Sequence, residues 1–145
     1  MAVRIAILKS DDRDVLTRVA PEVFDHDVRR ELCEEFLRDP RHHLAVAIDS
    51  DVVVGMASGV HYVHPDKEPE LWINEVAVAP THRTQGIGQQ LLRALLEVGR
   101  QSGCVEAWVL TDRSNLPAMR LYQSCGGNAD PGDLVMFEFP LREGH

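Results

Sequence analysis

Residues 76–92 read VAVAPTHRTQGIGQQLL: an apolar strand-like run, a turn with two glycines, and then the start of an apolar helical stripe. A helix that begins directly after such a turn leaves several backbone N–H groups without partners, all pointing the same way. Gly86 and Gly88 carry no side chain that would keep an anion away from these groups. Arg83 and the helix dipole add positive charge at the same place. The stretch therefore predicts a site for a phosphate or pyrophosphate.

Two common phosphate-binding motifs do not fit this turn. A P-loop needs Lys-Ser or Lys-Thr after its second glycine, whereas Gly88 is followed by Gln89 and Gln90. A dinucleotide fingerprint needs a third glycine, which the turn lacks. On the turn alone, a helix start with two glycines and no ligand is at least as frequent as an anion site.

Outward from this turn, the hydrophobic pattern predicts strands and helices along the chain. Strands are predicted at residues 3–8, 43–48, 52–63, 71–78, 105–111 and 134–139. Helices are predicted before Pro21, with Ser10 or Asp11 as the cap, and over residues 28–38, 86–100 and 117–124. This order of elements predicts an α/β (α+β) fold in a single domain over residues 1–145. We expect a mixed, mostly antiparallel twisted sheet with helices on both faces.

The composition is that of an ordinary folded protein, with 44% hydrophobic and 26% charged residues among 145. The net charge of −8 argues against nucleic acid or an anionic membrane as the main partner and suits a cationic ligand. Cys33, Cys104 and Cys125 form no disulfide framework, and the first residues become charged too early for a signal peptide. We therefore expect a reducing, cytoplasmic setting and no membrane span.

The segment Arg83-Thr84-Gln85-Gly86-Ile87-Gly88 resembles the Arg/Gln-x-x-Gly-x-Gly/Ala acyl-CoA loop of the GNAT N-acetyltransferases. Residues 115–122, with Asn, then Ala, then Leu-Tyr, resemble the second signature of that family. The order of elements agrees from about residue 3 to residue 139. The resemblance implies the GNAT fold, acetyl-CoA as the acetyl donor and, because relatives are often dimers, a homodimer. In one departure, Cys125-Gly126-Gly127 stands where the family usually has Gly-Phe, so the packing of the last strand is in doubt.

The resemblance also implies which residues hold acetyl-CoA. A strand edge would hold the pantetheine arm, the glycine turn would hold the pyrophosphate, and the short helix after it would line the thioester end. The implied residues are, in that order, Val76, Ala77 and Val78; Arg83, Thr84, Gln85, Gly86, Ile87, Gly88 and Gln89; and Asn115, Ala118 and Tyr122.

Two side chains are candidates for the chemistry. Glu75 lies just before the cofactor stretch, where partial desolvation would raise its proton affinity and suit it to general base catalysis, directly or through a water. A solvated or ion-paired glutamate is the alternative, but family members with an acid on this strand favour the base. Tyr122 would donate a proton to the leaving thiolate, or it is a core aromatic residue, and the two interpretations stand equal. The backbone N–H of Val76 is the natural donor to a developing oxyanion.

A narrower resemblance concerns the acceptor. Residues 21–25, 72–78 and 111–122 resemble the aminoglycoside 3-N-acetyltransferases of the gentamicin-resistance type. That resemblance implies direct transfer to the 3-amino group of an aminoglycoside in a ternary complex, with antibiotic resistance as the outcome. Transfer to another amine, such as a polyamine, a small metabolite or a protein N-terminus, stays open. So does an acyl-CoA sensor without catalysis.

Acidic residues are the candidates for binding the cationic acceptor. Beside Glu75, the implied substrate-binding residues are Asp25, Asp112 and Glu138. Histidines 42, 43, 61, 64 and 82 do not recur at metal-ligand spacing, so no metal is expected. We expect these histidines in loops near the acceptor entrance.

Overall fold

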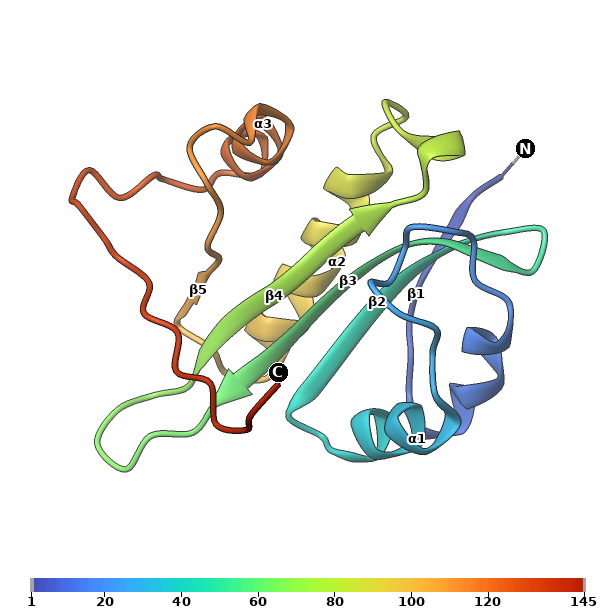
Figure 1. Cartoon of the computed structure of the whole chain (residues 1–145), viewed down its shortest axis with the longest axis horizontal. Helices are drawn as coiled ribbons and strands as arrows, with labels where there is room; N and C mark the ends of the chain where they lie inside the picture. The colour runs from blue at the N-terminus through green and yellow to red at the C-terminus, as the bar shows by residue number, and fades with distance from the viewer. Residues whose placement is uncertain (1, 145) are drawn as a thin grey trace.

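The apolar, β-branched runs of the chain form a five-stranded sheet in the computed structural model, which describes residues 2–144 (Figure 1). The strands, in spatial order, are β1 (Arg4–Ile7), β2 (His42–Asp49), β3 (Val52–Tyr62), β4 (Glu70–Val78) and β5 (Glu106–Trp108). Neighbours from β1 to β4 are antiparallel, and β5 runs parallel to β4. This confirms the expected mixed, mostly antiparallel sheet.

Helices cover both faces of the sheet, as expected (Figure 1). In chain order they are η1 (Ser10–Thr17), α1 (Arg30–Arg38), η2 (Pro80–His82), α2 (Ile87–Gln101) and α3 (Leu116–Ser124). The apolar stripe of α2 packs on one face through Leu91 and Leu95, which are fully buried. Burial of each leucine contributes roughly 1.5–3 kcal/mol. We call this the α2 face, and the opposite one, which carries α1 and η1, the α1 face.

The glycines of β3 identify the face to which each side chain of this strand points. A Cβ atom on Gly55 would lie 3.0 Å from Leu91 Cδ1, and one on Gly59 would lie 3.5 Å from Leu95 Cδ2, so both positions face α2. Because side chains alternate along a strand, Ser58 and Tyr62 point to the α1 face. Residues that pair across neighbouring strands share a face, so β3 fixes the orientation of β4 as well.

The first predicted helix is a 3-10 helix, and neither Ser10 nor Asp11 caps it. The N-cap is Lys9, whose backbone N–H donates to the Asp12 carboxylate at 2.8 Å. Asp12 itself has non-helical backbone angles, so the regular α-helix expected from the spacing of Val15 and its apolar neighbours does not form. A local side-chain bond therefore outweighs the apolar periodicity here.

The predicted strand at residues 105–111 is shorter in the structure, where β5 ends at Trp108. β4 and β5 pair only as far as Trp72 and Trp108, and beyond this point they diverge (Figure 1). The residues after Trp108 have no neighbouring strand to accept their hydrogen bonds, and without pairing they do not form a strand.

The predicted strand at residues 134–139 is wrong: from residue 128 to residue 144 the structure has neither helix nor strand. The apolar residues Leu134, Val135, Met136, Phe137 and Phe139 are 69–78% exposed. Their pattern is strand-like, but Pro131 and Pro140 flank the segment closely, and the edge strand β5 offers only three residues for pairing. Within residues 2–144, no helix has the length and apolar character to cross a membrane.

Candidate active site

A β-bulge in β4 decides where Glu75 points. Ser58 of β3 pairs with Glu75 and Gly59 pairs with Ile73, so Asn74 is an extra residue in β4. Ile73 is buried and faces α2, as its partner Gly59 does. Simple alternation would place Glu75 on the same face, beneath α2. The bulge instead puts Glu75 opposite Ser58, on the α1 face.

Glu75 is a partly buried carboxylate whose pKa is raised. Burial is the main cause, and the negative charge of Asp25, in the loop between η1 and α1, raises the pKa further. A carboxylate with raised proton affinity is better suited to take a proton from an ammonium group near neutral pH. The structure thus brings together Glu75 and Asp25, two of the residues expected at the acceptor site.

An open pocket of about 720 Å³ is formed by η1, α1 and the loop between them. Its charged lining includes Arg13, Asp14, Glu22, Asp25, Asp27 and Arg30, with Phe24 and Val28 among its apolar walls. Both arginines are paired with Glu34, at 3.6 Å and 3.1 Å. Of the loop carboxylates Glu22, Asp25 and Asp27, only Glu22 has an ion-pair contact among residues 2–144, with Arg83 at 3.9 Å. The pocket therefore favours a cationic ligand.

The end of β4 has a free backbone edge. Ala79 donates its N–H to the Val54 carbonyl of β3 at 2.8 Å, so alternation turns the N–H and C=O groups of Val76 and Val78 away from β3. β5 has already diverged on that side. An extended ligand can pair with such an edge as an added strand does. Of the three strand residues expected to hold the pantetheine arm, Ala77 faces β3, and Val76 and Val78 face this edge, where the Val78 carbonyl already accepts a hydrogen bond from Arg83 Nε.

The turn from Arg83 to Gly88 gathers free N–H groups at the start of α2. Thr84 (φ 63°) and Gly86 (φ 78°) adopt left-handed conformations that curl the backbone. Within the described residues, the N–H groups from Thr84 to Gln89 have no backbone acceptor, and the first helical bond runs from Gln90 to the Gly86 carbonyl. A Cβ atom on Gly86 would meet no atom within 4 Å. This curled, accessible backbone fits a pyrophosphate.

Arg83 and His82 hold this turn in place. Arg83 Nε donates to the Val78 carbonyl at 3.1 Å, and its Nη2 lies 3.9 Å from the Glu22 carboxylate. His82 Nε2 lies 2.7 Å from Asp49 Oδ2 at the end of β2. Sequence reasoning missed the His82–Asp49 contact, because it joins residues 33 positions apart and no pattern marks the pair.

The residues expected at the thioester end lie on or next to α3. Asn115 caps this helix, since its Oδ1 accepts the Ala118 N–H at 3.2 Å. Tyr122 is half-buried, and burial raises the pKa of its phenol, which is protonated near neutral pH with or without this shift. Gln89 Nε2 donates to Ser124 Oγ at 3.0 Å and ties α3 to the start of α2. Direct contact of these residues with a thioester stays a prediction.

Two further acceptor candidates lie on irregular segments. Asp112 is exposed in the connection from β5 to α3. Glu138 is exposed on the segment after α3, where no strand positions it. Their roles as ligands for substrate ammonium groups therefore stay predictions.

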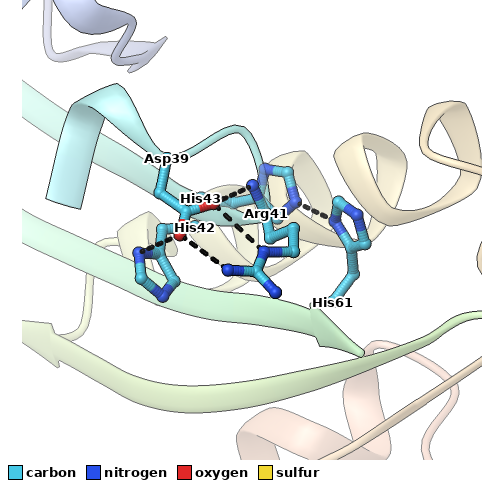
Figure 2. A network of polar contacts seen from close by, with 5 residues as sticks. All are labelled: Asp39, Arg41, His42, His43 and His61. Carbon is cyan, nitrogen blue, oxygen red and sulfur yellow. Dashed lines mark hydrogen bonds and ion pairs between the residues drawn. The ribbon is translucent and has the colours of Figure 1, made fainter. Parts of the chain in front are cut away.

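Three of the histidines expected in loops are on strands instead (Figure 2). His43 of β2 and His61 of β3 face α2, with His43 Nε2 2.8 Å from His61 Nδ1 and the rings stacked at 5.0 Å. Burial lowers the pKa of His43 to about 4 and also lowers that of His61. His42 points to the other face, where it stacks on Phe36 of α1. Among residues 2–144, no group of three or more His, Cys, Asp or Glu side chains is arranged to hold a metal ion.

Comparison with known proteins places this arrangement in a family. Residues 10–127 match the acetyltransferase (GNAT) family. The chain is a member of the GNAT family. GNAT acetyltransferases use acetyl-CoA as the acetyl donor. That the turn and the strand edge described above hold it in this chain stays a prediction.

Two curated relatives and one solved structure illustrate the similarity. Streptothricin acetyltransferase of Streptomyces lavendulae is 34% identical over 106 residues, which cover 73% of this chain and 54% of that protein. N-acetyltransferase 8 of Homo sapiens is 37% identical over 82 residues, which cover 56% of this chain and 36% of that protein. The GNAT chain thus spans from about a third to about half of the length of these relatives. An aminoglycoside acetyltransferase from an uncultured soil metagenomic sample, solved with trehalose, shares the fold with a TM-score of 0.82 at 22% identity, over 97% of both chains.

Proposed function

We propose that this GNAT chain transfers the acetyl group of acetyl-CoA to an aminoglycoside, at its 3-amino group, and so confers resistance to the antibiotic. The observation that carries the proposal is the position of Glu75. The bulge turns this carboxylate toward the acidic α1 face, while the next residue, Val76, borders the free edge of β4. Solved structures of aminoglycoside acetyltransferases share the fold and support this choice of acceptor.

The donor has a matching set of backbone groups. The free N–H groups of residues 84–89 and the Arg83 guanidinium would hold the pyrophosphate, and the edge at Val76 and Val78 would hold the pantetheine arm. When bound, acetyl-CoA supplies a thioester carbonyl that is reactive toward a free amine. The Val76 N–H, directed to the open side, is available to an oxygen on which negative charge develops.

Glu75 acts as the general base, directly or through a water. An aminoglycoside reaches the enzyme as a polycation, and an ammonium group cannot attack until it has lost a proton. The pocket carboxylates, Asp25 among them, attract the cation, and Glu75 accepts its proton. Tyr122, whose pKa is raised by burial, provides the proton for the departing thiolate.

The transfer is direct and uses no acetylated side chain. Cys125 Sγ lies 4.0 Å from the Gln89 carbonyl and 3.9 Å from Ser124 Oγ, and neither group can remove its proton. Burial raises the pKa of the Cys33 and Cys104 thiols, which makes them poor nucleophiles. All three cysteines are free thiols.

The test is release of coenzyme A thiol by the purified chain, with gentamicin, kanamycin, streptothricin, spermidine and a short peptide offered separately. Turnover of gentamicin, with the acetyl group located on the 3-amino nitrogen by NMR, is the expected result. Turnover of another amine alone would keep the chemistry and overturn the aminoglycoside assignment. Binding of acetyl-CoA without turnover of any amine would instead indicate a sensor.

A further inference from the structure

Ser58 is a buried polar residue in an apolar part of β3. It is 8% exposed, and it is the only residue with a polar side chain in the buried stretch of this strand, residues 53–59. Its cross-strand neighbour on β2, Leu44, is 3% exposed. A hydroxyl group in such surroundings is unfavourable unless it forms a hydrogen bond. The Ser58 hydroxyl therefore requires a partner.

Within the described part of the chain, no protein group provides that partner. The Ser58 side chain takes part in none of the hydrogen bonds among residues 2–144. The side-chain atoms that are both fully enclosed and without a hydrogen bond are Nδ1 of His42 and Nε2 of His64, and Ser58 Oγ is not one of them. The hydroxyl thus reaches space that a water molecule can enter, although the rest of the residue is buried.

The polar side chain next to Ser58 is the candidate base, Glu75. The two residues pair across β3 and β4, and both point to the α1 face. The Cβ atoms of residues at such paired positions lie about 4.5–5.5 Å apart. Because no hydrogen bond joins the Ser58 hydroxyl directly to the Glu75 carboxylate, a water molecule that bonds to both groups can bridge them.

The surroundings of Glu75 supply the contacts that a bridging water needs. A water held inside a protein has roughly two to four polar partners. Ser58 and Glu75 provide two of them. Asp25 is close enough to raise the pKa of Glu75, and it lines the acceptor pocket. An ammonium group attracted by Asp25 is the third partner, at the point where the acceptor must lose its proton.

We propose that Ser58 holds a water molecule against Glu75, and that this water passes the proton of the acceptor ammonium group to the Glu75 carboxylate. This inference rests on the proposed function and adds a positioning residue to it. The water accepts hydrogen bonds from the Ser58 O–H and the ammonium N–H, and it donates one to Glu75. In the transfer, an N–H bond of the acceptor breaks and an O–H bond forms on Glu75. The water and Ser58 end with as many protons as they had.

The titration of Glu75 tests the proposal without turnover. Carbon-13 NMR of the labelled chain without acetyl-CoA follows the carboxyl signal, identified by its absence in Glu75→Gln. A water that donates to a carboxylate favours the charged form, so Ser58→Ala should move the titration of Glu75 to higher pH. Ser58→Thr keeps the hydroxyl and should titrate as the native chain does. Ser102→Ala, at the end of α2, removes a hydroxyl on another element and is the control.

A Glu75 titration that is the same in Ser58→Ala and in the native chain would overturn the inference, whether or not the chain acetylates an amine. A shifted titration in a chain that acetylates no amine would keep Ser58 as the residue that holds the water and would overturn the proposed function. The two failures are therefore distinguishable.

Kinetics with an amine that the chain acetylates separate proton transfer from packing. Ser58→Ala should lower kcat about tenfold, with the KM for the amine and the Kd for acetyl-CoA nearly unchanged. The loss should become smaller as the pH rises, because a growing share of the amine has already lost its proton. In the Glu75→Gln background the same substitution should have little further effect, because the base that the water serves is gone.

A loss of kcat in Ser58→Ala that is equal at every pH would indicate a packing defect and overturn the inference. So would a loss that adds in full to that of Glu75→Gln, because two residues that act on one proton are not independent. Ser58→Thr should recover most of the native kcat, and Ser102→Ala should retain all of it.

Discussion

The two ends of β4 share one backbone but have different neighbours. From Glu70 to Trp72 the strand is paired on both sides, with β3 and β5, and its side chains build a packed aromatic surface. From Glu75 to Val78 it is paired with β3 alone, and its other edge is free. A strand paired on both sides has no backbone groups left for a ligand, whereas a half-paired strand has a row of them. The paired end should therefore contribute stability, and the free end activity.

The strongest test removes the carboxylate at the free end. Glu75→Gln keeps the shape of the side chain but cannot accept a proton, so kcat should fall about a thousandfold. The Kd for acetyl-CoA, measured by calorimetry, should not change, and the Tm should rise slightly, because the raised pKa of Glu75 means that its charge opposes folding. Glu97→Gln, an exposed substitution on α2, is the matched control. Full activity of Glu75→Gln at neutral pH would remove Glu75 from the mechanism.

The histidine pair at the paired end predicts a pH-dependent stability. The pKa of buried His43 is about 4 in the folded chain, below its ordinary value of 6.5. The folded state therefore excludes the proton that the unfolded chain binds. The resulting stabilisation is complete above pH 6.5 and is lost as the pH falls toward 4, which amounts to about 3 kcal/mol.

Urea unfolding of the native chain and of His43→Leu between pH 7.5 and about 4.5 tests this prediction. Between these pH values, the free energy of unfolding of His43→Leu should fall much less than that of the native chain. His26→Ala, at an exposed loop position, should show the same fall as the native chain. Identical pH profiles for the native chain and His43→Leu would contradict the assignment.

The glycine turn offers a matched pair of substitutions. Both Asp and Asn tolerate the left-handed conformation of Gly86, and a side chain there meets open space. Gly86→Asp places a negative charge beside the expected pyrophosphate and should weaken acetyl-CoA binding about tenfold or more, whereas Gly86→Asn should weaken it far less. Calorimetry measures both values. Equal losses in the two variants would mean that the turn does not bind an anion.

The smallest expected effect concerns the charge beside Glu75. Asp25 raises the pKa of Glu75, so Asp25→Asn should lower that pKa and move the acidic limb of the kcat profile to lower pH. Asp14→Asn is the control, because Asp14 lies in the same pocket wall but does not contribute to the raised pKa of Glu75. An acidic limb that stays in place in Asp25→Asn would show that another group controls it.

Hydrophobic periodicity was sufficient for the long elements. The predicted boundaries of β2, β3, β4 and α2 lie within one or two residues of those observed, because each is a long apolar run with turn residues at its ends. The predicted length of β5 was too great, and the strand predicted at residues 134–139 does not form. A strand needs a partner, and the sequence does not show where neighbouring strands diverge.

Part of the candidate site could be predicted from the sequence. The glycine turn could be found because its residues are consecutive. The orientation of Glu75 could not, because it depends on the register between β3 and β4 rather than on any residue type. The His43–His61 and His82–Asp49 contacts likewise join strands and turns that are distant in sequence.

The bulge at Asn74 has a genetic consequence. Deletion of this single codon would make Glu75 follow Ile73 directly, and regular alternation would still direct the Glu75 carboxylate to the α1 face, opposite Ser58. The deletion would remove only the local bend and extra twist that a bulge adds to a strand. In a regular strand, by contrast, the loss of one residue turns all the following side chains to the other face of the sheet. The orientation of Glu75 is therefore less sensitive to a change of length at Asn74 than it would be at a regular position of β4.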